Sequence, residues 1–450
     1  MNDWHDAERR VELAGELFQQ HKWAQALREL QAATRINPYN AAWFHNMGLV
    51  LDELGRFEQA VEAYRKADRL KPDDLETLSR LATDLHRINR LRASLRVLRR
   101  IREIDPSHEP AYCLSILLHG ELGEHDQAEE MFYLARLYKD QCPRCYDHMG
   151  RSLFARGRYE RAIFCFQKCL DLDNAAGDVT MRLAQAYWKK GENEKARRHF
   201  LTDLRANPGR LESLLDMGDL LSEMGLNDEA GEKFRRALEL SPDHAASYLR
   251  YGRWLIRRGK LDEAHTAFEK TLRLDPTHCG PNLELAKLAH RRGDPPAALR
   301  HLRAEHVRRP RQPQILLGLA NLWMDIGELR TASACLRRLL HDHPDNVDAW
   351  LNLAVAQFHR RDYRQGIRSC RQALCRDQNN RTAMFNTALA YERLHKYDRA
   401  LHWTRRALKL QPRDVNLQHL ERRLELLRWI SRVLAVPRRL AQTIWRLLYY

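Results

Sequence analysis

Glycine, proline and long apolar runs are scarce in this chain. Only 20 glycines and 16 prolines occur among its 450 residues, which leaves few places for long loops. No stretch approaches the roughly 18 apolar residues that span a bilayer. The first residues, MNDWHDAERRVELAGELF, carry acids where a secretion signal needs basic residues. We therefore expect a soluble, cytoplasmic protein.

The short motifs of common catalytic centres are also missing. The sequence contains no H-E-x-x-H motif, no Walker-type glycine loop, no G-x-S-x-G elbow and no dinucleotide fingerprint. Catalysis would have to be assembled from scattered side chains that no pattern marks. We therefore expect no enzyme activity, no catalytic residues, no cofactor and no metal ion.

Basic residues are in excess, with 76 Lys and Arg against 60 Asp and Glu and a formal net charge of +16. This charge eases the approach of acidic proteins, nucleic acid or anionic lipid, but it does not determine a fold. The nine cysteines are an odd number in a long chain, so reduced thiols are expected rather than a disulfide framework.

A period of 34 residues runs through the sequence without an insertion. Its boundaries are marked by Pro38, Pro72, Pro106, Pro208, Pro242, Pro276, Pro310, Pro344 and Pro412. Midway between boundaries stand Gly55, Gly123, Gly157, Gly191, Gly225, Gly259, Gly293 and Gly327. Glycine suits a turn between two helices because it accepts positive φ. Each period therefore predicts two helices joined at the glycine and separated from the next pair at the proline.

Alanine and bulky residues at helical spacing follow these glycines, as in Ala60 and Tyr64. Segments such as WFHNMGLVLDELGRFEQAVEAYRKADRLKP and YLRYGRWLIRRGKLDEAHTAFEKTLRLDP resemble tetratricopeptide repeats (TPRs). The resemblance covers about residues 7–412. It implies an all-α, right-handed superhelical solenoid of about twelve repeats, whose first helices line a concave groove that binds protein segments. Some glycosyltransferases carry similar arrays beside a separate catalytic domain, for which this sequence leaves little room.

Three parts are expected along the chain: a repeat solenoid over residues 1–412, a capping helix over 413–436 and a basic amphipathic tail over 437–450. The cap should cover the last repeat with Leu417, Leu420, Leu424, Leu427 and Ile430. Asp203 and Glu305 occupy the column that holds Ala67, Ala135, Ala237, Ala373 and Ala407 in other repeats, so we expect each to be partly exposed or paired.

Cys142 and Cys145 form a C-x-x-C motif, and Cys165 and Cys169 follow in the same repeat. Antiparallel helix packing makes a four-thiolate zinc site conceivable. A free cysteine on a helix also behaves as a small buried hydrophobe. The sequence favours that second interpretation and leaves zinc as the alternative.

A candidate binding groove follows from equivalent positions on successive first helices. One column is apolar and consists of Met181, Leu215, Leu249, Leu283, Leu317, Leu351 and Phe385. Neighbouring columns are basic and contain Arg182, Lys189, Arg250, Arg253, Arg257, Lys287 and Arg291. Asn352 and Asn386 resemble the asparagines with which some TPR superhelices hold a peptide backbone.

These columns predict a protein-binding scaffold, or adaptor, for an acidic, leucine-bearing segment that is extended or helical. Alternatively, the leucines pack between adjacent helices and the arginines pair with Asp219, Glu223 or Glu284. An RNA-associated solenoid is a second functional alternative, although few aromatic residues interleave with the basic ones. The tail allows a third, an assembly factor that is peripheral at the inner face of a membrane. The oligomeric state does not follow from the sequence.

Overall fold

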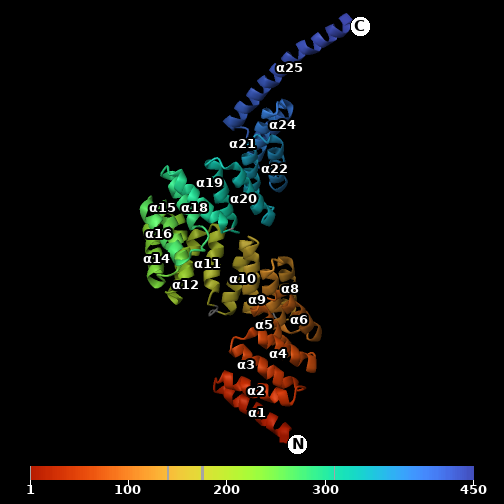
Figure 1. The fold of residues 1–450 in the computed structure, drawn as a ribbon, viewed down its shortest axis with the longest axis vertical. Coiled ribbons are helices and arrows are strands. Elements are labelled where there is room, and N and C mark those ends of the chain that lie inside the picture. The colour runs from red at the N-terminus through yellow and green to blue at the C-terminus, as the bar shows by residue number, and fades with distance from the viewer. Residues whose placement is uncertain (1, 139–140, 174–176, 309, 450) are drawn as a thin grey trace. The chain divides into compact units, whose positions relative to one another are not determined.

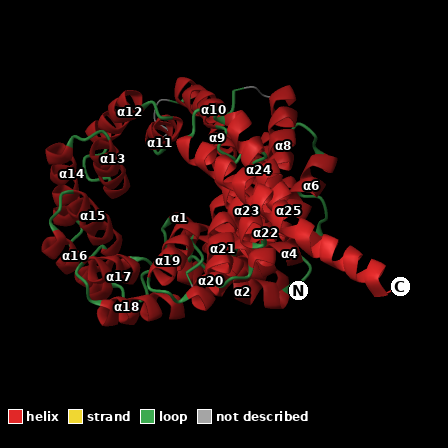
Figure 2. Ribbon diagram, turned by 90° about the horizontal axis from the view of Figure 1, so that it is seen from above, coloured by secondary structure: helices red, strands yellow, loops and turns green. Residues whose placement is uncertain are grey.

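The computed structural model describes the backbone of residues 2–138, 141–173, 177–308 and 310–449, and the side chains of these residues except 2–3 and 433–449. Every regular element in this described part is a helix, and loops join the helices (Figure 2). The chain divides into two compact units, residues 1–233 and 234–450. Each unit is built from helix pairs in sequence order (Figure 1). The predicted all-α array of twelve helix pairs is confirmed.

The first unit holds seven helix pairs. The second helix of the seventh pair continues into the second unit. The helices are α1 (Asn2–Gln19), α2 (Trp23–Ile36), α3 (Ala41–Glu53), α4 (Phe57–Leu70), α5 (Leu75–Arg87), α6 (Leu91–Ile104), α7 (Glu109–Glu121), α8 (His125–Tyr138), α9 (Pro143–Ala155), α10 (Tyr159–Leu172), α11 (Val179–Lys190), α12 (Asn193–Ala206), α13 (Leu211–Glu223) and α14 (Asn227–Leu240).

The second unit begins inside α14 and adds five further pairs and one single helix. These are α15 (Ala245–Arg257), α16 (Leu261–Leu274), α17 (Pro281–Arg291), α18 (Pro295–Val307), α19 (Pro313–Asp325), α20 (Leu329–Asp342), α21 (Val347–His359), α22 (Tyr363–Arg376), α23 (Arg381–Arg393), α24 (Tyr397–Leu410) and α25 (Val415–Tyr449).

The turn inside each pair has the geometry that the glycine column predicts. All eight glycines of that column have positive φ, between 69° and 92°. Several first helices also begin at a side-chain cap, as at Asn346, whose side chain accepts a hydrogen bond from the backbone of Ala349. Turn residues therefore separate the two helices of a pair, and side-chain caps fix the start of several first helices.

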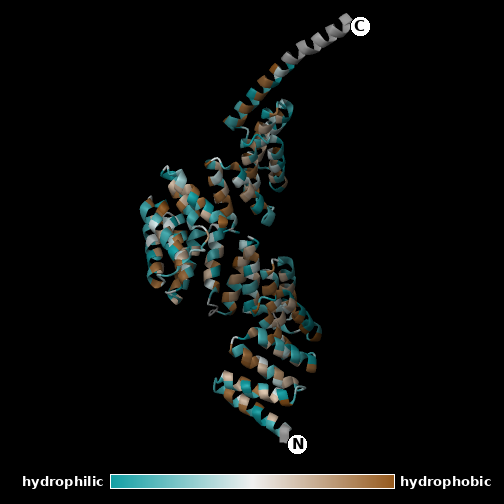
Figure 3. Ribbon diagram, in the orientation of Figure 1, coloured by the Kyte–Doolittle hydropathy of each residue, from teal (hydrophilic) through white to brown (hydrophobic). Residues whose placement is uncertain are grey.

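The core forms where small residues of a first helix meet bulky residues of its partner. Ala264 and Phe268 of α16 are fully buried, and the Phe268 ring packs on Gly252 of α15. Apolar residues alternate with hydrophilic ones along the helices in both units (Figure 3). Each pair therefore shares its core with the neighbouring pairs of its unit.

Helix α25 covers the last pair with its first turns only. Leu417, Leu420 and Leu424 are buried, as predicted. Leu427 is half-buried, and Ile430 is 37% exposed, so the prediction that Ile430 contributes to the cap is wrong. The backbone continues as one helix through Pro437, while the side chains of the predicted tail, 437–450, lie outside the described residues. Over the described part of the chain, no helix combines the length and apolar character needed to cross a bilayer.

The two acids in the alanine column are paired but not partly exposed. Asp203 is 2% exposed and accepts hydrogen bonds from Arg210 (2.6 Å) and Ser213 (2.5 Å). Glu305 is fully buried and accepts a 2.7 Å hydrogen bond from the backbone of Gly280, where α17 begins. The expectation that each is partly exposed or paired is confirmed through pairing, because both carboxylates accept hydrogen bonds inside the array.

Candidate partner-binding surface

The predicted groove residues all lie on first helices, but they fall into both units. Arg182 and Lys189 are on α11 and Leu215 is on α13 of the first unit. The remaining ones lie on α15, α17, α19, α21 and α23 of the second unit. The two sets are therefore considered separately.

Four members of the predicted apolar column are buried. The exposed fractions are 7% for Met181, 3% for Leu215, 6% for Leu249 and 2% for Leu283. Leu283 fills the space over Gly318, where an added Cβ would lie 2.7 Å from its Cδ2 atom. The prediction of an exposed apolar stripe is wrong for these four residues, because they pack against neighbouring helices.

The last three members of the column keep part of their surface exposed. Leu317, Leu351 and Phe385 are half-buried at the edge of two apolar clusters in the second unit. They stand on α19, α21 and α23, and each of these helices contacts the next. One partly exposed apolar side chain is therefore presented by each of three successive repeats.

Amide side chains lie on the same helices. The Nδ2 atom of Asn352 donates a 2.9 Å hydrogen bond to Oδ1 of Asn321, which joins α21 to α19. Asn386, one repeat further on, is half-buried. The sequence columns did not single out Asn321 because it is not in register with Asn352. An amide has both donors and acceptors, so this row suits a peptide backbone.

The predicted basic groove residues of the second unit lie on α15 and α17. Arg253, Arg257 and Arg291 are exposed, while Arg250 and Lys287 are half-buried. One carboxylate, Glu284, is shared by Arg253 (3.3 Å) and Lys287 (3.2 Å).

The alternative that groove arginines pair with neighbouring acids is thus confirmed for Arg253 and Glu284. Glu284 thus offsets part of the charge of Arg253 and Lys287, while Arg250 and Arg257 have further interactions of their own.

The basic residues of the first unit have local partners. Arg182 forms ion pairs with Asp147 (2.8 Å) and Asp178 (3.4 Å). The Lys189 ammonium lies 5.0 Å from the ring centre of Trp188. These contacts hold both side chains against their own unit.

The C-x-x-C motif lies at the start of α9. Cys142 is the N-cap residue, and its Sγ atom accepts a 3.2 Å hydrogen bond from the backbone of Cys145. The Sγ atoms of Cys142, Cys145 and Cys113 all lie within 4.8 Å of one another. Hydrogen bonds from Cys113 and Cys145 hold the pKa of Cys142 well below its usual range.

The structure does not bring together the four thiols of the zinc alternative. Among the described residues, Cys165 and Cys169 of α10 do not belong to the group of three thiols. Burial raises the pKa of Cys165 to about 11 and that of Cys169 to about 12, which keeps both protonated. The sequence pattern missed Cys113 on α7. The sequence could have pointed to Cys113, because residues about one repeat apart on adjacent first helices face each other. Arg182 and Asp147 show the same relation.

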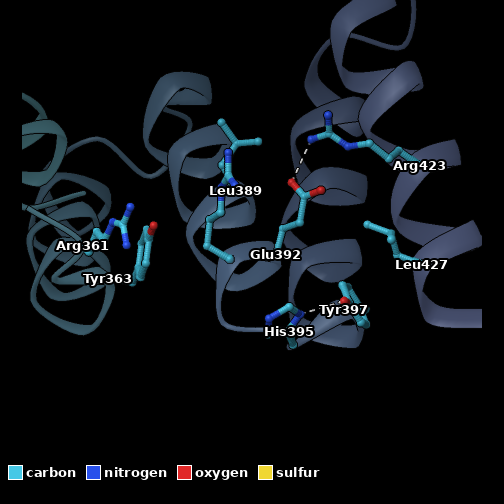
Figure 4. Close-up of a pocket in the computed structure, with 9 residues that line it drawn as sticks. Arg361, Tyr363, Leu389, Glu392, His395, Tyr397, Arg423 and Leu427 are labelled. Atoms are coloured by element: carbon cyan, nitrogen blue, oxygen red, sulfur yellow. Dashed lines mark hydrogen bonds and ion pairs between the residues drawn. The ribbon is translucent and has the colours of Figure 1, made fainter. Parts of the chain in front are cut away.

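A pocket of about 730 Å³ opens near the C-terminal end of the second unit (Figure 4). It is lined by Arg361, Tyr363, Leu389, Glu392, Arg393, His395, Tyr397, Arg423 and Leu427. Arg423 of α25 donates a 2.8 Å hydrogen bond to Glu392 of α23. Leu427 faces this pocket, which explains its partial exposure.

Family models described as tetratricopeptide repeat match residues 11–74, 153–217, 209–277, 283–304, 317–364 and 382–414. The chain belongs to the tetratricopeptide-repeat family. TPR arrays are typically non-catalytic scaffolds for protein interaction.

Curated relatives match part of this TPR protein. Human protein O-mannosyl-transferase TMTC3 is 22% identical over 219 residues, which cover 45% of this chain and 24% of that protein. The TPR repeat-containing protein YpiA of Bacillus subtilis is 28% identical over 146 residues, which cover 32% of this chain and 34% of YpiA. The chain thus spans between a quarter and about a third of these relatives.

Solved structures with a similar arrangement include yeast Tom70 and a tetratricopeptide-repeat protein from Parabacteroides merdae. Tom70 is 18% identical with a TM-score of 0.46, over 97% of this chain and 98% of Tom70. The Parabacteroides protein is 17% identical with a TM-score of 0.48, over 56% of this chain and 99% of that protein.

Proposed function

We propose that this TPR protein is a non-catalytic scaffold that holds an acidic, leucine-bearing segment of another protein against the first helices of its second unit. The observation that carries the proposal is the row of partly exposed apolar side chains Leu317, Leu351 and Phe385 on successive repeats. Exposed apolar residues at a regular spacing suit the apolar side chains of a bound segment.

Polar groups on the first helices of the same unit suit this segment. Asn352 and Asn386 offer amide donors and acceptors to a peptide backbone. Arg253, Arg257 and Arg291 supply positive charge, which favours acidic partners and speeds their association. Leu249 and Leu283 are too buried to touch a partner, and we assign them to the core.

A charge-reversal variant tests the proposal. Full-length protein and the variant with Arg250, Arg253 and Arg257 all changed to Glu are used to purify partners from the native host. The affinity of each recovered partner is then measured. We expect the triple change to weaken binding at least tenfold, because each lost charge pair at an interface costs on the order of 1 kcal/mol or more.

A matched control reverses three exposed arginines of second helices, Arg330, Arg337 and Arg364. This control should bind as the unchanged protein does. Equal partner affinity in both variants and the unchanged protein would contradict the proposal. Recovery of RNA with an affinity that falls steeply with salt would favour the nucleic-acid alternative instead.

A further inference from the structure

We propose that Cys113, Cys142 and Cys145, with Glu109 as the fourth ligand, bind one zinc ion that links α7 to α9. All four residues belong to the first unit, whereas the proposed partner surface belongs to the second unit. The inference does not depend on the scaffold function.

The positions of the three sulfur atoms carry the proposal. Each pair of Sγ atoms is within 4.8 Å. Zinc bound tetrahedrally by thiolates at about 2.3 Å places its sulfur ligands about 3.8 Å apart. Small rotations of the side chains therefore bring all three sulfurs onto one ion. Helices α7 and α9 contact each other directly, so their backbones already hold the ligands together.

The surroundings favour an anionic sulfur at Cys142, and zinc would displace the protons of the other two thiols. Cys113, Cys142 and Cys145 are between 2% and 5% exposed, so water is largely kept from the sulfur atoms. Cys142 caps the N-terminus of α9, where the partial positive charge of the helix stabilises an anion. The backbone N–H of Cys145 points at its Sγ atom, a hydrogen bond that orients a metal-bound sulfur.

Glu109 would complete the four ligands of zinc by a rotation of its side chain, because its carboxylate oxygens are not within 4.8 Å of all three sulfur atoms. It lies four residues before Cys113 on α7, so both side chains leave the same face of the helix. Its carboxyl group is hydrogen-bonded to Cys142. Three thiolates and one carboxylate complete a closed tetrahedral set for zinc. Copper(I) would need only the three sulfurs. Metal binding that depends on Glu109 therefore distinguishes zinc from copper(I).

The first test is the metal content of full-length protein purified under reducing conditions from zinc-supplemented cells. We expect about one zinc ion per chain by elemental analysis. The variant with Cys142→Ser and Cys145→Ser should lose this zinc, as should Cys113→Ser. The control with Cys335→Ser and Cys370→Ser, two buried thiols of the second unit, should keep it.

Spectroscopy on the unchanged sequence keeps the proposal testable if a cysteine variant does not fold. Metal-free, reduced protein titrated with Co²⁺ should show thiolate-to-cobalt charge transfer and the intense visible bands of a tetrahedral site, saturating at one equivalent. Glu109→Gln should weaken zinc about tenfold in competition with a chelator.

Four results would overturn the proposal. They are an absence of zinc and of the cobalt spectrum, zinc retained when Cys142 and Cys145 are both changed, bound copper(I) in place of zinc, and a zinc affinity that Glu109→Gln leaves unchanged.

Discussion

At the scale of single residues, the turn column contains four members that are not glycine. His21, Asn89, Arg361 and His395 are in register with the turn glycines and adopt φ between 55° and 62°. Asn and His accept the left-handed conformation more readily than other side chains, so the neighbouring repeats impose it most clearly on Arg361. The glycine column does not mark these four turns, and only the 34-residue period places them.

Replacing one of these residues by glycine should stabilise the protein. Arg361→Gly is expected to raise the free energy of unfolding by about 1 kcal/mol, because glycine accepts positive φ without a steric penalty. The measurement is urea unfolding followed by circular dichroism. The reverse change at an equivalent turn, Gly327→Arg, should destabilise by a similar amount, and a loss of stability in Arg361→Gly would contradict this account.

A second residue-scale feature is the buried carboxyl of Asp84. Asp84 is fully buried, and Arg87 donates hydrogen bonds to Asp84 (3.0 Å) and to Asp52 (2.8 Å). Burial, followed by the neighbouring Asp52, raises the pKa of Asp84 from 3.8 to about 7. The folded state therefore favours the protonated form. Its contribution to stability is complete below pH 3.8 and is lost as the pH rises through 7.

We expect Asp84→Asn to remove this pH dependence. Between pH 5 and 8 the unchanged protein should lose roughly 2 kcal/mol of unfolding free energy relative to the variant. Chemical unfolding at a series of pH values measures the difference. The exposed carboxylate of Asp126 offers a control, since Asp126→Asn should keep the original profile. Parallel profiles for Asp84→Asn and the unchanged protein would refute the assignment.

At the scale of helices, close packing in several pairs depends on a glycine beneath an aromatic ring. A Cβ atom on Gly252 would lie 2.5 Å from Phe268, and Gly150 and Phe166 form an equivalent contact at 2.6 Å. The small residue lets the second helix approach the first, and the ring fills the space between them.

Adding one methyl group at this contact should loosen the pair. Gly252→Ala is expected to lower the unfolding free energy by about 1–3 kcal/mol, because the ring cannot move without disturbing the core. Calorimetry or urea unfolding reports the change. In the double variant with Phe268→Leu, the combined loss should be smaller than the sum of the single losses. Gly15→Ala on α1 is the control, since no atom lies within 4 Å of its added Cβ, and it should be neutral or stabilising.

The sequence predicted the helices better than their faces. The period locates equivalent positions, and the second helices therefore end at Ile36, Leu70 and Ile104, as expected. The period does not tell whether an apolar column faces solvent or a neighbour. A first helix packs on both sides, so Leu283 meets Gly318 and is buried. How deeply a column residue is buried depends on the side chain that packs against it from the neighbouring helix. One column of equivalent positions does not identify that side chain.

At the scale of the whole molecule, the chain forms two compact units that its constant repeat period does not reveal. The 34-residue register passes through α14 without a break, yet the two compact units meet within that helix, between Lys233 and Phe234. A constant period carries no information on where compact units end, because that depends on the fit of side chains between successive pairs. Neither could the sequence predict that Ile430 lies beyond the last covered turn of α25.

Removal of residues 437–450 tests the role of the predicted tail. We expect the shortened protein to fold with nearly unchanged melting, because Leu417, Leu420 and Leu424 still cover the last pair. Flotation with anionic liposomes is the second measurement. Flotation that is lost on deletion would support attachment to a membrane surface. If full-length protein never floats, the membrane alternative is wrong, and collapse of the shortened protein would contradict the folding prediction.

The buried Asp203 bears on how such an array can evolve. Repeat arrays lengthen and shorten by duplication and loss of single units, and an apolar seam tolerates this exchange because it leaves no polar group unsatisfied. Asp203 accepts hydrogen bonds from Arg210 and Ser213 of the following repeat. If that repeat were lost, the next one would present Ser247 and His244 in their places, so the hydroxyl would return and the guanidinium would not. We therefore expect related proteins to keep these two repeats together. Gain and loss of single repeats should be confined to interfaces that contain no buried charge.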